Sequence, residues 1–424
     1  MGRIGVHIPE FLTCSYPEAK KAFFGGSQNL ELINAWKTAP LVGNLKIILD
    51  IPALVINGLI TWLVYVGIKE SKNLNNLFVI LKLFIILMVI AMGIAFINTD
   101  NWFPVSTVTH TPSFMPNGFA GVMSAVSGVF FAYIGFDALS VLSEETKNPQ
   151  KNLPRGMIIS LVLCTIIYII LTLVLTGMVD YRKFEGIGDP LAFIFEKSNA
   201  NIAWMELVVS LGAIIAITTV LLVFQMGQPR IWYAMSRDGL MPKKFMEIHP
   251  KHKTPAFATI LTGIVVGVPI LFTDKSFILD FTSIGTIFAF VLVCGGVLLL
   301  PSKEKLKGRF HLPYINAKII FPVIFLGGLL FFYWWQPEFF HTLMNWDHET
   351  AGEFRISMFF FIVINLGLCV LAFVKNLSLI PLMGLSSCLY LLTGMSHNNW
   401  FWFLVWFAIG LVIYFSYGFK NSKL

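Results

Sequence analysis

The sequence has few charged residues: Asp, Glu, Lys and Arg make up 12% of its 424 residues, against about a quarter in soluble domains. Catalytic signatures are also missing, because there is no P-loop, HExxH, GxSxG or Rossmann fingerprint and no pair of His at metal-ligand spacing within a helix. These absences give no support to an enzyme. We therefore expect no catalytic residue, no bound metal and no cofactor.

Cysteine is scarce, and its pattern argues against a disulfide framework. The five cysteines are an odd number without CxxC spacing, and four of them, Cys164, Cys294, Cys369 and Cys388, lie in apolar stretches. We expect these four to be small core hydrophobes. The N-terminus likewise lacks a basic region followed by an apolar stretch, so no signal peptide is expected.

Hydrophobic residues are abundant instead, at 56% of the chain, and they form long blocks separated by short polar loops. A helix needs about 20 apolar residues to cross roughly 30 Å of hydrocarbon. The pattern predicts an all-α polytopic membrane protein with eleven spans, preceded by a peripheral segment at residues 1–46. The predicted spans are 47–68, 74–97, 119–142, 155–179, 203–226, 256–273, 279–300, 316–335, 355–374, 378–395 and 399–418.

The cations in the short loops predict the orientation, because loops rich in Lys and Arg stay in the cytoplasm. The stretches 147–155, 230–253 and 303–318 carry many cations, whereas the 98–118 connection has no Lys or Arg and is expected outside. This sorting accounts for the net charge of +7, so no nucleic-acid partner is expected. The C-terminus is predicted to be cytoplasmic.

An odd number of spans would place residues 1–46 outside, although no segment within the sequence directs their export and they carry five cations. We therefore expect an N-terminally incomplete membrane protein, with an odd number of further spans ahead of Met1. The alternative is a short tail that is translocated on its own.

Lys82 is an unusual residue in its span, at a depth of roughly 12 Å from the cytoplasmic end at 1.5 Å per residue. A charged Lys in mid-span costs about 2.5–3.5 kcal/mol on insertion scales. Its helical neighbours, such as Phe78 and Ile86, are apolar. Lys82 therefore either extends back to the inner interface or meets acceptors from other helices, where desolvation would favour the neutral amine and a role in carrying protons.

The third predicted span has a possible interruption at Tyr133-Ile134-Gly135-Phe136-Asp137, where a Gly lies between two aromatic residues and two positions before an acid. Such a sequence suits a local unwinding whose freed backbone groups line a cavity. The alternative is a continuous helix with Asp137 close enough to the inner interface to be hydrated. A charged loop containing Pro149 and Pro154 follows and is expected to connect to the next helix.

Thr218 and Thr219 lie near mid-depth in the fifth predicted span. Threonines at this depth commonly bond back to their own helix, and otherwise they face a ligand. Both alternatives remain open from the residues alone.

Several motifs resemble one family of membrane proteins. They are FFAYIGFDALSVLSEETKNPQKNLPRG at 130–156, GQPRIWYAMSRDGLMPK at 227–243, HPKHKTP at 249–255, IGTIFAFVLVCGGVLLL at 284–300 and WFLVWFAIGLVIYFSYG at 402–418. In order and spacing they are similar to the amino acid–polyamine–organocation superfamily, in particular its cationic amino acid transporter subfamily.

The resemblance implies a LeuT-type inverted-repeat fold without its first three helices, the first of which carries the other broken segment of the family's site. In that fold, residues 47–97 are the remnant of the first repeat. Residues 98–118 are an extracellular loop, 119–300 are the second repeat with a break near 131–137, and 301–424 contribute four additional spans.

The resemblance also implies roles for individual residues. The substrate-facing positions would be Phe131, Ala132, Tyr133, Ile134 and Gly135, with Phe131 as an aromatic gate, and Thr218 would approach the substrate side chain. Lys82, together with Asp137, would couple transport to protons.

The expected function is therefore proton-coupled symport of amino acids across the plasma membrane, with amino acids, protons and the lipid bilayer as partners. The alternatives are an exchanger, or a non-transporting remnant or split half of such a permease. The sequence does not indicate which amino acid is carried or which oligomer forms.

Overall fold

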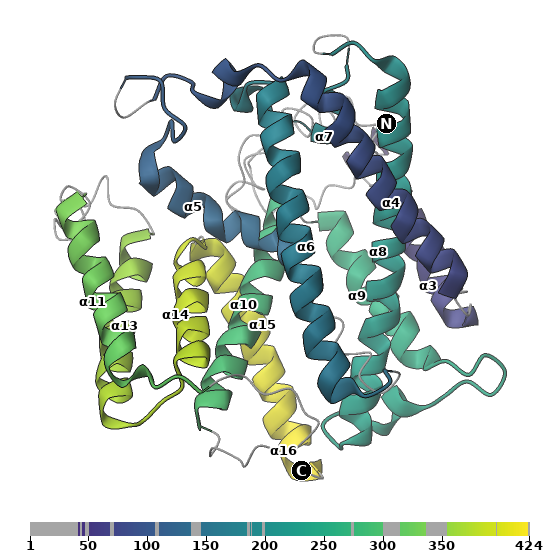
Figure 1. Cartoon of the computed structure of the whole chain (residues 1–424). Helices are drawn as coiled ribbons and strands as arrows, with labels where there is room; N and C mark the ends of the chain where they lie inside the picture. Colours follow the sequence, from purple (N-terminus) through teal and green to yellow (C-terminus); the bar gives the residue numbers. More distant parts are fainter. Residues whose placement is uncertain are drawn as a thin grey trace.

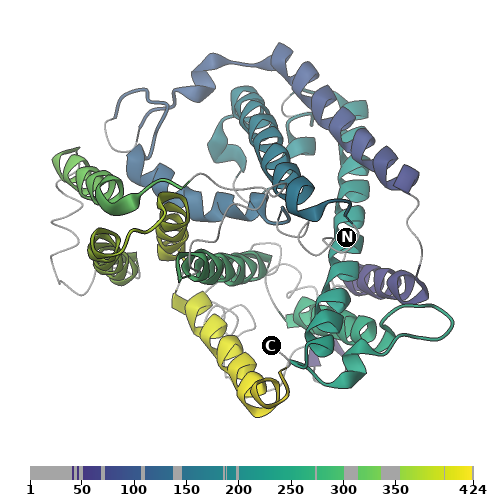
Figure 2. The ribbon, with the colours of Figure 1, turned by 60° about the horizontal axis from the view of Figure 1, so that its bottom comes forward.

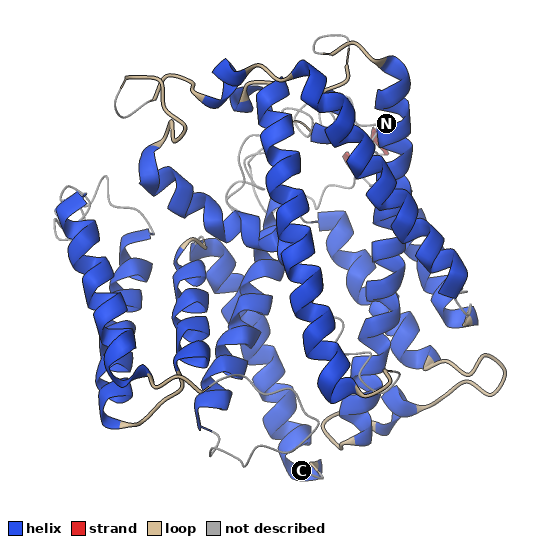
Figure 3. Cartoon of the chain, in the orientation of Figure 1, coloured by secondary structure: helices blue, strands red, loops and turns tan. Residues whose placement is uncertain are grey.

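The computed structural model describes residues 41–42, 45–46, 51–67, 72–106, 110–136, 146–184, 187, 189–196, 200–272, 275–299, 314–335, 354–395 and 397–422. Nearly all of these residues are helical, as Figure 3 shows. The strands within the described residues are a two-residue pair, β1 (Leu41–Val42) and β2 (Leu45–Lys46), which run antiparallel.

Each of the eleven predicted spans overlaps one α-helix of the described residues. These helices are α3 (Ile51–Val66), α4 (Lys72–Gly93), α5 (Gly118–Phe130), α6 (Pro149–Met178), α8 (Ala203–Arg237), α9 (Ala256–Phe272), α10 (Lys275–Leu299), α11 (Ala317–Trp335), α13 (Phe354–Val374), α14 (Leu379–Thr393) and α15 (His397–Ile413). Seven helices of the described residues are long and apolar enough to cross a membrane, and α3, α5, α9 and α14 are shorter apolar helices.

Two helices extend more than five residues beyond the predicted spans. Helix α6 begins at Pro149 and contains Pro154, both of which the sequence placed in a loop. Proline is compatible with the start of a helix because the first turn has unpaired N–H groups anyway. Helix α8 likewise continues past Pro229 to Arg237. The apolar pattern marks only the part of a helix that is suited to hydrocarbon, so it does not reveal the polar extensions at the start of α6 and the end of α8.

The helices form two groups that Figures 1 and 2 show on either side of the molecule. The α8 group consists of α3, α4, α6, α8 and α9, and the α10 group consists of α10, α11, α13, α14 and α15. Within the α8 group, Val89 and Val209 belong to a buried core between α4 and α8. Within the α10 group, Ile287 and Phe403 belong to a buried core between α10 and α15.

Helix α5 is inclined to the other helices and ends near the centre of the molecule, where α6 and α10 pass (Figure 1). It contacts α10 and α14, and the 3-10 turn that follows it contacts α10. The end of α5 therefore lies where residues from both helix groups can reach it.

Candidate functional site

The α-helical geometry of α5 is lost at the predicted break near 131–137, and we name residues 131–136 the break segment. Helix α5 ends at Phe130, and Phe131–Tyr133 form a single 3-10 turn. Ile134 is then extended, with φ −62° and ψ 129°. Gly135 has φ +126°, a conformation that residues with a side chain rarely adopt. The regular hydrogen-bond pattern is therefore interrupted here, and Gly135 makes the change of direction possible.

Helix α6 supports the break segment from one side. The hydroxyl of Tyr168 donates a hydrogen bond to the carbonyl oxygen of Ala132 at 3.0 Å. The rings of Tyr168 and Tyr133 also meet edge to face, with centroids 5.5 Å apart. One α6 side chain thus contacts both the main chain and a side chain of the break segment.

Helices α8 and α10 contact the other residues of the break segment. The ring of Phe136 lies 5.5 Å from that of Phe290 on α10. A β-carbon at Gly135 would be 3.8 Å from the ring of Phe224 on α8. The break segment is therefore contacted by aromatic side chains from α6, α8 and α10, which belong to both helix groups.

The predicted substrate-facing residues differ in exposure. Phe131 is 38% exposed and Ala132 is exposed as well, so both are accessible from outside the packed core. Tyr133, Ile134 and Gly135 are half-buried. Asp137, the predicted proton-coupling acid, lies outside the described residues.

Lys82 meets an acceptor on another helix. Its ammonium group donates a hydrogen bond to the hydroxyl oxygen of Thr219 on α8, and that hydroxyl donates to the carbonyl oxygen of Ala216 at 2.8 Å. Lys82 itself is half-buried. Of the two alternatives that the sequence left open, the structure therefore shows contact with a neighbouring helix.

The close approach of α4 and α8 is made possible by Gly212. A β-carbon there would lie only 2.5 Å from Cδ1 of Ile85, which is one turn from Lys82 on α4. Any larger residue at position 212 would have to displace that side chain. Gly212 therefore helps to bring Lys82 within reach of Thr219.

Thr218 lies on a different face of α8 from Thr219. Its hydroxyl donates to the carbonyl oxygen of Ile214 at 2.8 Å, and the residue is exposed. Successive residues of a helix are about 100° apart, so Thr218 lies about 120° around α8 from Phe224, the residue that contacts the break segment. The role of Thr218 toward a substrate side chain stays a prediction.

Sequence reasoning did not identify a polar network that joins α3, α8 and α9. Gln225 on α8 is 7% exposed and donates to the hydroxyl oxygen of Thr61 at 2.9 Å, and Thr61 donates to the carbonyl oxygen of Asn57. The side-chain amide of Asn57 donates to the carbonyl oxygen of Gly263 at 2.9 Å. Two features of the sequence could have indicated this network: polar residues inside apolar spans, and the four-residue spacing of Gly263 and Gly267, which permits close helix packing.

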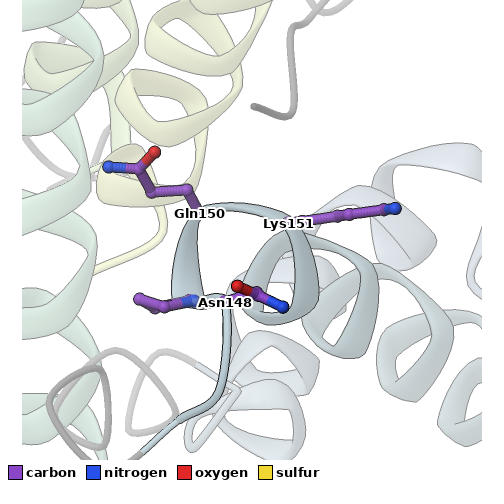
Figure 4. Close-up of a pocket in the computed structure, with 4 residues that line it drawn as sticks. Asn148, Gln150 and Lys151 are labelled. Carbon is purple, nitrogen blue, oxygen red and sulfur yellow. The ribbon is translucent and has the colours of Figure 1, made fainter. Parts of the chain in front are cut away.

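A pocket of about 420 Å³ is lined by Asn148, Pro149, Gln150 and Lys151 at the beginning of α6, as Figure 4 shows. Tyr168 lies about five turns further along α6, about 27 Å from Gln150 at 1.5 Å per residue. The pocket is therefore separate from the break segment. Within the described residues, no group of three His, Cys, Asp or Glu is arranged to hold a metal.

Comparison with known proteins places this arrangement in a family. A model described as "Amino acid permease" matches residues 49–346. The chain belongs to the amino acid permease family. A second model, for the C-terminus of such permeases, matches residues 377–422 of this family member. The predicted membership of the amino acid–polyamine–organocation superfamily is thereby confirmed, as is the predicted polytopic membrane protein.

Curated relatives of this permease are transporters by name. The branched-chain amino acid permease BcaP of Bacillus subtilis (strain 168) is 34% identical over 99% of this chain and 70% of its own length. The methylthioribose transporter of the same organism is 34% identical over 89% of this chain and 66% of its own length. The vacuolar cationic amino acid transporter 4 of Arabidopsis thaliana is 33% identical over 66% of this chain and 45% of its own length.

Proposed function

We propose that this permease carries amino acids across the cytoplasmic membrane by secondary active transport coupled to protons. The observation that supports a proton role is the contact between Lys82 on α4 and Thr219 on α8, which holds a titratable amine between two membrane helices. Desolvation penalises the ammonium form, so a lysine in such a place can change between ammonium and neutral amine. Lys82 then takes up a proton from outside and releases it inside.

The proposed substrate class rests on the break segment. Backbone groups freed at a broken helix suit the amino and carboxylate groups that all amino acids share. The side chains of Phe131, Ala132, Tyr133 and Ile134 carry no charge, so they would surround the apolar part of a substrate. Phe131 would cover it, and Thr218 would approach its side chain. Relatives named for branched-chain and for cationic amino acids make both groups the first to test.

Transport would follow from alternating access of one inverted repeat against the other. In this proposal, residues 47–97 belong to the first repeat, 119–300 form the second with its break near 131–137, and 301–424 add four spans. The 98–118 loop lies outside and the C-terminus lies in the cytoplasm. Asp137 would assist Lys82 in moving protons.

The proton role is tested with the full chain in proteoliposomes under an imposed pH gradient, acid outside. We expect Lys82→Gln to abolish gradient-driven uptake of leucine and arginine, because glutamine cannot carry a proton. The control is Lys318→Gln, which removes a lysine at the start of α11. The Nζ atom of Lys318 lies 5.2 Å from the centroid of the Phe373 ring on α13. This variant should retain uptake.

Retention of pH-driven uptake by Lys82→Gln would refute the proton role. Uptake only into vesicles preloaded with amino acid, without a response to pH, would identify an exchanger instead. If the unmodified protein takes up neither probe under either condition, the transport proposal itself fails for those substrates, and a non-transporting protein is favoured.

A further inference from the structure

Tyr168 occupies a particular place in α6. Its hydroxyl oxygen lies 3.0 Å from the carbonyl oxygen of Ala132, and its ring meets the ring of Tyr133 edge to face. The residue is half-buried. Two independent contacts thus fix the phenol, one polar and one aromatic.

The hydroxyl meets a main-chain group that the break leaves without its helical partner. In a continuous α-helix, the carbonyl of Ala132 would accept from the amide four residues later, at position 136. Ile134 is extended and Gly135 has a positive φ, so that helical arrangement is not continued here. An unpaired carbonyl at membrane depth is costly, and the Tyr168 hydroxyl satisfies it.

The bond to Tyr168 leaves room for a second donor. A carbonyl oxygen has two lone pairs, so the Ala132 oxygen can accept from Tyr168 and from one further group at the same time. The direction of the remaining lone pair is then set by the bond that Tyr168 already makes. The contact therefore orients the same main-chain group that is expected to face the amino acid.

We propose that Tyr168 is a positioning residue for the substrate site, which holds the Ala132 carbonyl and the break segment in the shape that binds the amino group of the substrate. This inference rests on the proposed transport function. Because every amino acid has the same amino group, the loss of the Tyr168 hydroxyl weakens all substrates to the same extent. A residue that reads the substrate side chain would instead affect different amino acids differently.

The matched variants are Tyr168→Phe and Tyr314→Phe. Phenylalanine keeps the ring that packs against Tyr133 and removes only the hydroxyl. The Tyr314 hydroxyl also donates to a backbone carbonyl, that of Asn376 at 2.9 Å, but it joins the residues before α11 to the turn after α13. The two variants therefore lose the same kind of hydrogen bond at different places.

Uptake is measured for leucine, alanine and arginine with each full-length variant in proteoliposomes. For Tyr168→Phe we expect KM to rise about three- to tenfold, by the same factor for every transported probe, with kcat within about twofold, which is the size of one lost hydrogen bond. For Tyr314→Phe we expect no change in KM. An unchanged KM for Tyr168→Phe, or a rise for only one probe, overturns the proposal.

A second measurement does not depend on transport. Hydrogen exchange of the amides in residues 131–136, followed on the purified protein, should be faster in Tyr168→Phe than in the unmodified chain and unchanged in Tyr314→Phe. Equal exchange in all three proteins overturns the positioning role. If the unmodified protein transports none of the probes but exchange rises in Tyr168→Phe alone, the transport proposal fails while Tyr168 still holds the break segment.

Discussion

Replacement of Thr219 by valine is the sharpest test of the proposed proton site. Valine has nearly the shape of threonine but lacks the hydroxyl that accepts from the Lys82 ammonium group. The hydroxyl also donates to the carbonyl oxygen of Ala216. That carbonyl belongs to the regular backbone of α8, so the loss of this second bond should disturb the helix little. The substitution therefore removes a bond to the charged form of Lys82 with little other disturbance.

The size of the effect follows from the chemistry of the lost bond. A hydrogen bond to a charged group contributes about 1.5–3 kcal/mol. Lys82 has further interactions, which will replace part of the loss, so we take about 1.5–2 kcal/mol. One pH unit corresponds to about 1.4 kcal/mol, so the pH of half-maximal uptake should fall by about 1–1.5 units. The ammonium form is the one that loses a partner, and the shift must therefore be toward acid.

The assay is initial uptake into proteoliposomes as a function of external pH, at a fixed internal pH. We expect the pH of half-maximal uptake to fall by about one unit or slightly more in Thr219→Val. Thr218→Val is the matched control, because the neighbouring hydroxyl bonds to the carbonyl oxygen of Ile214 on its own helix. In Thr218→Val the pH of half-maximal uptake should equal that of the unmodified protein, even if the preference among substrates changes.

A midpoint that stays in place in Thr219→Val would show that the Lys82 contact does not set the proton affinity. A shift of the midpoint toward alkaline pH would contradict the sign of the argument, because it would mean that Thr219 stabilises the neutral amine. An equal shift in both threonine variants would point to a general disturbance of α8.

Two further predictions concern the packing of the α8 group. Gly263→Ala should lower the free energy of unfolding by about 1–3 kcal/mol, seen as a lower Tm, because its β-carbon would lie 2.6 Å from Thr61. Gly285→Ala in α10 is its control: no atom of the described residues lies within 4 Å of an added β-carbon, so this variant should not lower Tm. Gln225→Leu should lower the free energy of unfolding by about 0.5–1.5 kcal/mol, because the bond to Thr61 is lost. The double variant Gln225→Leu/Thr61→Val should lose less stability than the sum of the two single variants, because both remove the same bond.

The positions of the helices could be predicted from the sequence because hydrocarbon thickness sets the length of each apolar run. The break could be anticipated only as one of two alternatives. Gly135 permits an unwinding, but whether a glycine unwinds a helix depends on what satisfies the freed groups. Here the Ala132 carbonyl is satisfied by Tyr168, 36 residues away in the sequence, and no local pattern reveals that contact.

The partner of Lys82 was beyond sequence reasoning for a similar reason. Lys82 and Thr219 are 137 residues apart, and α8 is apolar on most of its surface, so periodicity does not show which face turns toward α4. The prediction selected Thr218, and a shift of one residue on a helix changes direction by about 100°. Tertiary packing, including that of Gly212 against Ile85, fixes the rotation of α8 that brings Thr219 to Lys82.

Helix α8 connects the proposed proton site with the break segment. Thr219 contacts α4, Phe224 lies next to Gly135, and Gln225 bonds to Thr61 on α3. At about 100° per residue these three contacts are roughly 100–140° apart around the helix, and at 1.5 Å per residue they lie within about 9 Å along it. A rotation of α8 that relieves one contact therefore strains another. Loss of a proton at Lys82 would weaken its bond to Thr219 on one side of α8 only, and we propose that this effect reaches the break segment through Phe224.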